Sequence, residues 1–125
     1  MGSGWYAMGA VAAGVAVALG AFGAHGLRPR LGPELMEIFE TGVRFHMYHA
    51  LGLLAVGWGA MRWPGRWVQV AGWCFTAGIA IFSGSLYLLT MTGMGRLGAI
   101  TPVGGVAFMV GWAALAIAAL RGLRQ

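Results

Sequence analysis

Trp5 to Ala24 reads WYAMGAVAAGVAVALGAFGA, a stretch without a single charged residue. The hydrocarbon core of a bilayer is about 30 Å thick, and an α-helix rising about 1.5 Å per residue needs about 20 residues to cross it. This stretch has the required length. Backbone N–H and C=O groups in lipid must be satisfied within their own segment, so the stretch predicts a membrane-spanning helix.

A cleavable secretory signal peptide is the alternative for this stretch, because Ala21 to Ala24 supply small residues of the kind that precede a cleavage site. A signal peptide has an apolar region of about 7–15 residues that follows a basic one. The stretch here is longer, and no basic residue precedes it. We therefore favour a span that is retained.

Three further apolar stretches follow, at about 45–61, 67–91 and 102–120. Together the four predict an all-α integral membrane protein, with four transmembrane helices in an antiparallel bundle that forms a single domain over residues 1–125. A β-barrel would need alternating strands of about ten residues, which the sequence lacks. Pro64-Gly65 marks a tight turn between the second and third helices, and Thr101-Pro102 predicts an N-cap and first residue for the last helix.

The composition agrees with a membrane protein. Of 125 residues, 59% are hydrophobic and 9% are charged, whereas a soluble domain has about 25% charged residues. This composition excludes a small soluble domain and a disordered chain. The single Cys74 excludes an intramolecular disulfide.

The net charge of +5 comes from eight basic residues, all of them Arg, against three acidic ones. The arginines lie between the apolar stretches, so we expect them to contact lipid headgroups and not nucleic acid. With four spans, both termini share one side of the membrane with the turn at Pro64. The arginine distribution favours the cytoplasm for that side.

Gly32-Pro33-Glu34 predicts the start of a short interfacial helix between the first and second spans. Its glutamates would lie near the positive end of the helix dipole. We expect this helix to lie in the membrane interface before the chain turns inward.

Small residues recur at four-residue spacing on three of the predicted spans, which predicts faces where helices pack closely. The residues are Gly72, Thr76, Ala80 and Gly84 on the third span, Ala10, Gly14 and Ala18 on the first, and Ala107 and Gly111 on the fourth. On this basis Gly84→Leu should disrupt assembly. Trp112, in the middle of the fourth span, is interpreted as a packing residue.

Polar residues inside a membrane are costly, so the few near the second span are candidates for function. Glu40 and Arg44 are four residues apart on a helix, and Tyr48 follows one turn later. The spacing is typical of an ion pair at the membrane edge. A proton or anion gate is the functional alternative.

His46 and His49 are three residues apart and would face the same side of a helix, with His25 near the end of the first span. Such imidazoles could bind a metal or haem, or could hydrogen-bond across helices. The sequence lacks HExxH and CxxCH motifs, so we predict no metal site and no cofactor. Ser83 and Ser85 add hydroxyls but no nucleophile elbow, and no catalytic group of residues is identified.

Five short motifs, taken together, resemble the membrane family called domain of unknown function 423. They are Gly20-Ala21-Phe22-Gly23-Ala24-His25-Gly26, Phe39-Glu40-Thr41-Gly42, Met47-Tyr48-His49-Ala50, Phe82-Ser83-Gly84-Ser85-Leu86-Tyr87 and Ile100-Thr101-Pro102-Val103-Gly104-Gly105. The resemblance implies a four-span protein of the bacterial inner membrane with no established activity. The family more often has Gln at the position of His46, which weakens a metal site formed by two histidines.

Three functions are therefore considered. The first is a non-enzymatic accessory subunit that forms a homo-oligomer or joins a larger membrane complex. The second is a small transporter or channel with a polar path along His49, Tyr48, Glu40 and Arg44. The third is a haem-, metal- or quinone-binding subunit that uses His25 and His49.

Overall fold

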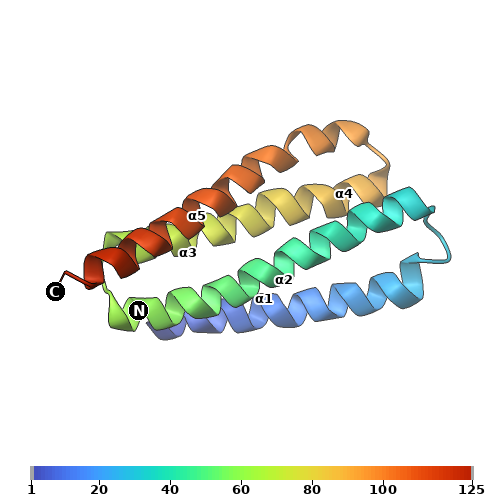
Figure 1. Cartoon of the computed structure of the whole chain (residues 1–125). Helices are drawn as coiled ribbons and strands as arrows, with labels where there is room; N and C mark the ends of the chain where they lie inside the picture. The colour runs from blue at the N-terminus through green and yellow to red at the C-terminus, as the bar shows by residue number, and fades with distance from the viewer. Residues whose placement is uncertain (1, 125) are drawn as a thin grey trace.

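The computed structural model describes residues 2–124, which form four helical rods arranged antiparallel to one another (Figure 1). In chain order the elements are α1 (Gly2–Phe22), the π-helical turn η1 (Gly23–Leu27), α2 (Pro33–Arg62), α3 (Arg66–Gly78), the π-helical turn η2 (Ile79–Ser83), α4 (Gly84–Thr92), the 3-10 turn η3 (Gly95–Ala99) and α5 (Thr101–Gly122). Segments α3, η2 and α4 follow one another without a break and form one rod. No strand occurs within the described range.

The four rods are not packed equally against one another. Helix α1 packs mainly against α2, and α5 packs mainly against α3, so the second and third rods lie in the middle. The start of α1 and the end of α5 lie at the same end of the molecule, together with the turn between α2 and α3 (Figure 1).

Three of the four rods are long and apolar enough to cross a membrane, judged by length and composition. They are Gly2–Leu27, Arg66–Thr92 and Gly95–Gly122. The rod formed by α2 is also long, but its first half contains three glutamates and Arg44. These charges lower its apolar character relative to the other three.

The short interfacial helix expected between the first two spans is not a separate element. A helix does begin at Pro33, as predicted, but it runs on to Arg62 over 30 residues. No Pro separates the amphipathic part from the apolar part, and Gly42 between them stays helical, packed against the Tyr87 ring, so the two segments join in one helix. At about 1.5 Å per residue this helix is about 45 Å long, which exceeds the hydrocarbon thickness by several turns.

Two glycines allow the tight connections. Gly65, before α3, has φ +146°, and Gly93, at the end of α4, has φ +73°. L-residues with a side chain rarely adopt either conformation. The N–H of Gly93 also caps the helix by donating to the carbonyl of Leu89.

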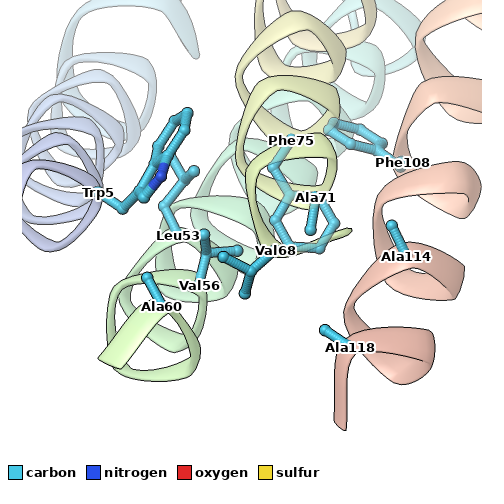
Figure 2. Packing of buried hydrophobic residues seen from close by; sticks show 10 residues of the cluster. All are labelled: Trp5, Leu53, Val56, Ala60, Val68, Ala71, Phe75, Phe108, Ala114 and Ala118. Carbon is cyan, nitrogen blue, oxygen red and sulfur yellow. The ribbon is translucent and has the colours of Figure 1, made fainter. Parts of the chain in front are cut away.

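The buried core contains side chains from all four rods (Figure 2). Phe75 of α3 is fully buried at its centre. A β-carbon at Gly52 would lie 3.0 Å from the Phe75 ring, and one at Gly111 would lie 2.6 Å from it. The two glycines therefore make room for this ring between α2 and α5.

Helices α1 and α2 approach each other through glycines that the sequence pattern had not singled out. A β-carbon at Gly57 would lie 2.7 Å from the carbonyl oxygen of Gly2, and one at Gly9 would lie 2.8 Å from that of Ala50. A side chain at either position would meet backbone, which cannot move aside. Close packing of small residues thus joins these two helices.

The small residues expected on the third rod fall into two groups. A β-carbon at Gly72 would lie 2.6 Å from the Trp5 ring, so this glycine is in close contact with α1. The Thr76 hydroxyl donates to the carbonyl of Gly72 at 2.9 Å. Ala80 is exposed, and nothing lies within 4 Å of a β-carbon placed at Gly84. Only the first half of this row therefore packs within the chain.

Candidate functional site

The polar side chains buried between the rods form the candidate site, and His49 of α2 lies at its centre. The His49 side chain is 5% exposed. Its ring stacks on Phe108 of α5, with 3.5 Å between the ring centroids and 8° between the planes. The Trp112 indole Nε1–H donates to His49 Nε2 at 3.0 Å, and His49 Nδ1 lies 2.7 Å from the carbonyl oxygen of Phe45.

These partners determine where the proton of His49 lies. An indole nitrogen can only donate, so Nε2 must accept and carries no proton. The proton then belongs to Nδ1, which donates to the Phe45 carbonyl. Both ring nitrogens are thus used within the chain, and neither has a free lone pair for a metal or haem iron.

A second histidine contact joins α2 to α4. His46 is 5% exposed, and its Nδ1 lies 2.8 Å from the Tyr87 hydroxyl. Close by, the fully buried hydroxyl of Ser83 donates to the Gly42 carbonyl at 2.7 Å. Ser83 is the last residue of the π-helical turn η2, and such turns alter the direction of the side chains that follow them. Both bonds connect helices and leave no reactive group exposed.

The Ser85 hydroxyl connects the third and fourth rods. It donates to the Phe82 carbonyl at 2.8 Å and lies 2.6 Å from Thr101 Oγ1. Thr101 was expected to cap α5, but the helix start has no side-chain cap. The N-cap prediction was wrong because the preceding 3-10 turn leads directly into the helix, which leaves the Thr101 hydroxyl to bond Ser85.

In the structure, Glu40 pairs with a different arginine from the one predicted. Glu40 Oε1 accepts from Arg28 Nη2 at 2.7 Å, and Arg44 instead donates to the Thr41 hydroxyl at 3.2 Å. The pairing of Glu40 with Arg44 was therefore wrong, because the loop after η1 brings a second guanidinium to the same carboxylate. The side chains of Arg28 and Glu40 are 60% and 41% exposed, so this pair lies at the surface.

The structure does not bring all the predicted site residues together. Tyr48 points outward and is 53% exposed. His25 is exposed in the turn at the end of α1, while His49 lies 16 residues into α2, about 24 Å along its axis. Within residues 2–124, no group of three His, Cys, Asp or Glu side chains is placed to hold a metal ion.

Trp112 and Tyr87 are the residues of this site that sequence reasoning missed. Trp112 had been interpreted as packing only, yet it supplies the hydrogen bond to His49. Its position in the sequence carried a signal: Trp in membrane proteins favours the interface, and an indole N–H in the apolar part of a bilayer needs a partner. A Trp in the middle of α5 therefore called for an acceptor on a neighbouring helix.

Trp5, near the start of α1, also donates its indole N–H to a side chain on another rod, that of Gln69 in α3. The Trp5 indole donates to Gln69 Oε1 at 3.1 Å. Among the buried side-chain N and O atoms of residues 2–124, Trp67 Nε1 is without a partner. The polar interior is thus almost completely satisfied by the chain itself.

Comparison with known proteins places these features in a family. A family model described as "Protein of unknown function (DUF423)" matches residues 19–105. This range begins near the end of α1 and includes His46, His49, Ser83 and Ser85.

Several curated relatives match over almost their full length. UPF0382 membrane protein YwdK of Bacillus subtilis is 50% identical over 115 residues, which cover 91% of this chain and 94% of the relative. A UPF0382 membrane protein of Staphylococcus epidermidis is 48% identical, covering 91% and 93%. A third, SAB0533 of Staphylococcus aureus, is 44% identical with the same coverage. No solved structure matches the chain.

Proposed function

The chain belongs to the DUF423 family, whose relatives are named as membrane proteins, and on that basis we propose that it is a non-enzymatic, oligomer-forming subunit of the bacterial inner membrane. All four rods cross the bilayer in this proposal, with both termini in the cytoplasm. The shared position of the two chain ends supports an even number of crossings (Figure 1).

The satisfied polar interior supports a structural role over catalysis or transport. A group that binds a substrate or relays a proton must come within hydrogen-bond reach of the substrate or of water. His49 uses both ring nitrogens, and Ser83 and Ser85 bond to carbonyls of the chain. The bonds from Trp112 to His49, from Ser83 to the Gly42 carbonyl and between Ser85 and Thr101 each connect one rod to another.

The outer face of α1 is the observation that carries oligomer formation. Ala10, Gly14 and Ala18 lie on this face at four-residue spacing, all exposed. Nothing of the same chain lies within 4 Å of a β-carbon placed at Gly14. Small residues facing outward allow a second helix to approach closely in lipid, where apolar surface alone does not drive association.

Crosslinking in a native-like bilayer tests this proposal. The chain reconstituted in lipid nanodiscs or a mild detergent should crosslink as a dimer or higher oligomer. Gly14→Leu should reduce the crosslinked fraction severalfold, because the added side chain holds the second helix away. Blue-native electrophoresis should show the same shift toward the monomer.

Val15→Leu is the matched control, since Val15 is exposed beside Gly14 and already carries a branched side chain. This variant should crosslink like the wild type. A wild-type chain that is monomeric under every mild condition would contradict the proposal.

A further inference from the structure

A hollow with an arginine on each side lies at the end of the molecule where the chain begins and ends. Its volume is about 290 Å³, and Arg66 at the start of α3 and Arg121 in the last turn of α5 both line it. The Arg66 guanidinium is held over the Trp67 ring, 5.1 Å from the ring centroid. Such cation–π contact limits the positions of the guanidinium.

The shape of this hollow depends on a tight contact between two rods. Trp63, in the turn after α2, lies directly against Gly122 of α5, where any side chain would collide with the indole ring. Trp63 also packs edge-on against Trp58, with 5.2 Å between the ring centroids. The Trp63 ring, held by Gly122 and Trp58, therefore forms one wall of the hollow.

The charge at this end is positive without compensation. Arg62, Arg66, Arg121 and Arg124 lie here. All three acidic residues of the chain lie in the first turns of α2, at the opposite end. A guanidinium offers a planar set of donors that matches two oxygens of a phosphate.

An apolar groove continues from the same place along the outside of the molecule. Trp63 lines both the hollow and this groove, which has a volume of about 360 Å³. The groove runs between α2 and α5, and its walls are apolar. They are Ala55, Trp58, Trp63, Trp112, Leu115, Ala116 and Ala119. A positive hollow and an apolar groove that share Trp63 as a wall match a molecule with a charged head and a hydrocarbon tail.

We propose that this end of the protein binds one anionic glycerophospholipid, with its phosphate between Arg66 and Arg121 and an acyl chain in the groove between α2 and α5. The two arginines determine the charge of the headgroup, and the groove selects a lipid over a free phosphate ion. The site shares no residue with the outer face of α1, so it is independent of oligomer formation through Gly14.

Native mass spectrometry of the full chain tests the phosphate contacts. The chain is released from nanodiscs that contain equal parts of phosphatidylglycerol and phosphatidylcholine. The wild type should retain phosphatidylglycerol in preference to phosphatidylcholine. The double variant Arg66→Gln/Arg121→Gln should retain at least about tenfold less of it, because each guanidinium makes charge-assisted hydrogen bonds to the phosphate.

The matched control is Arg30→Gln/Arg96→Gln, which removes the same charge from two exposed arginines at the other end. It should retain phosphatidylglycerol like the wild type. Equal retention by the two double variants would overturn the proposal. So would displacement of the lipid by millimolar inorganic phosphate, which would assign the hollow to a free anion.

A second pair of variants tests the groove without changing charge. Ala116→Phe places a ring in the groove and should reduce lipid retention severalfold. Ala113→Phe, on an exposed position of α5 outside the groove residues, should not. Equal retention by these two variants would show that no acyl chain occupies the groove.

Discussion

His49 shows how single residues hold this protein together. Its ring contacts α5 through stacking on Phe108 and through the bond from Trp112, while its other nitrogen is bonded within α2. An imidazole buried in this way is costly unless both nitrogens are paired. These contacts of His49 hold α5 against α2.

The bond between Trp112 and His49 should be measurable as a coupling energy. A double-mutant cycle with Trp112→Phe and His49→Phe should give about 0.6 kcal/mol, the average for hydrogen bonds between membrane helices, and at most about 1.7 kcal/mol. Reversible unfolding in mixed micelles is the measurement. Trp73→Phe, at a Trp that is 63% exposed, serves as the control and should show no coupling to His49. A coupling energy near zero for Trp112 would show that the bond adds nothing to stability.

Sequence reasoning identified the polar residues of the interior but not their partners. The spacing of His46 and His49 correctly places both on the buried side of one helix. Which residue each imidazole meets depends on how α2 is rotated against α4 and α5. The spacing of small residues pointed to Gly111 as a packing position, but not to Phe75 and Gly52 as its partners in the structure.

At the scale of elements, the apolar stretches located the helices well. The first stretch, at 5–24, corresponds to α1 and the start of η1, and the fourth, at 102–120, lies within α5. The π-helical turns could not be predicted, because a π turn differs from an α turn by one residue and has no composition of its own. The continuous α2 was also missed, since a change from amphipathic to apolar character does not end a helix.

Two glycines on the third rod should respond very differently to the same substitution. Gly72→Leu should lower the free energy of unfolding by about 1–3 kcal/mol, because the side chain would collide with the Trp5 ring. Gly84→Leu should leave the monomer's stability nearly unchanged, since nothing lies within 4 Å of that position. Thermal unfolding of the two purified variants compares them directly.

Gly84→Leu was expected to disrupt packing of the helix bundle. That expectation was wrong for contacts within the chain, because nothing lies within 4 Å of a β-carbon placed at Gly84. Reduced crosslinking of this variant would therefore report a contact between copies. An equal loss of thermal stability in both variants would contradict the packing described here.

At the scale of the whole molecule, the sequence motifs identified the family, and the family match confirms it. Composition alone indicated a helical membrane protein, which the helical rods and the names of the relatives support. Four crossings require α2 to span the bilayer although it is less apolar than the other three rods.

Cysteine labelling in intact cells measures the topology. In a Cys74→Ser background, Arg30→Cys and Met94→Cys should react with a membrane-impermeant maleimide. Both residues lie on the side of the membrane opposite the cytoplasm in the proposed orientation. Pro64→Cys and Leu123→Cys should react only after the membrane is opened. A different accessibility at Pro64 and Leu123 would exclude an even number of crossings between them.

The unequal packing of the rods has a consequence for biogenesis. Helix α1 packs mainly against α2, and α5 packs mainly against α3. The main partner of each rod therefore lies in the same half of the chain. The first pair can associate as soon as α2 has been synthesised, before the ribosome reaches α5. The third rod is paired in the same way once α5 has been synthesised, and the two pairs of rods then dock through α2 and α3.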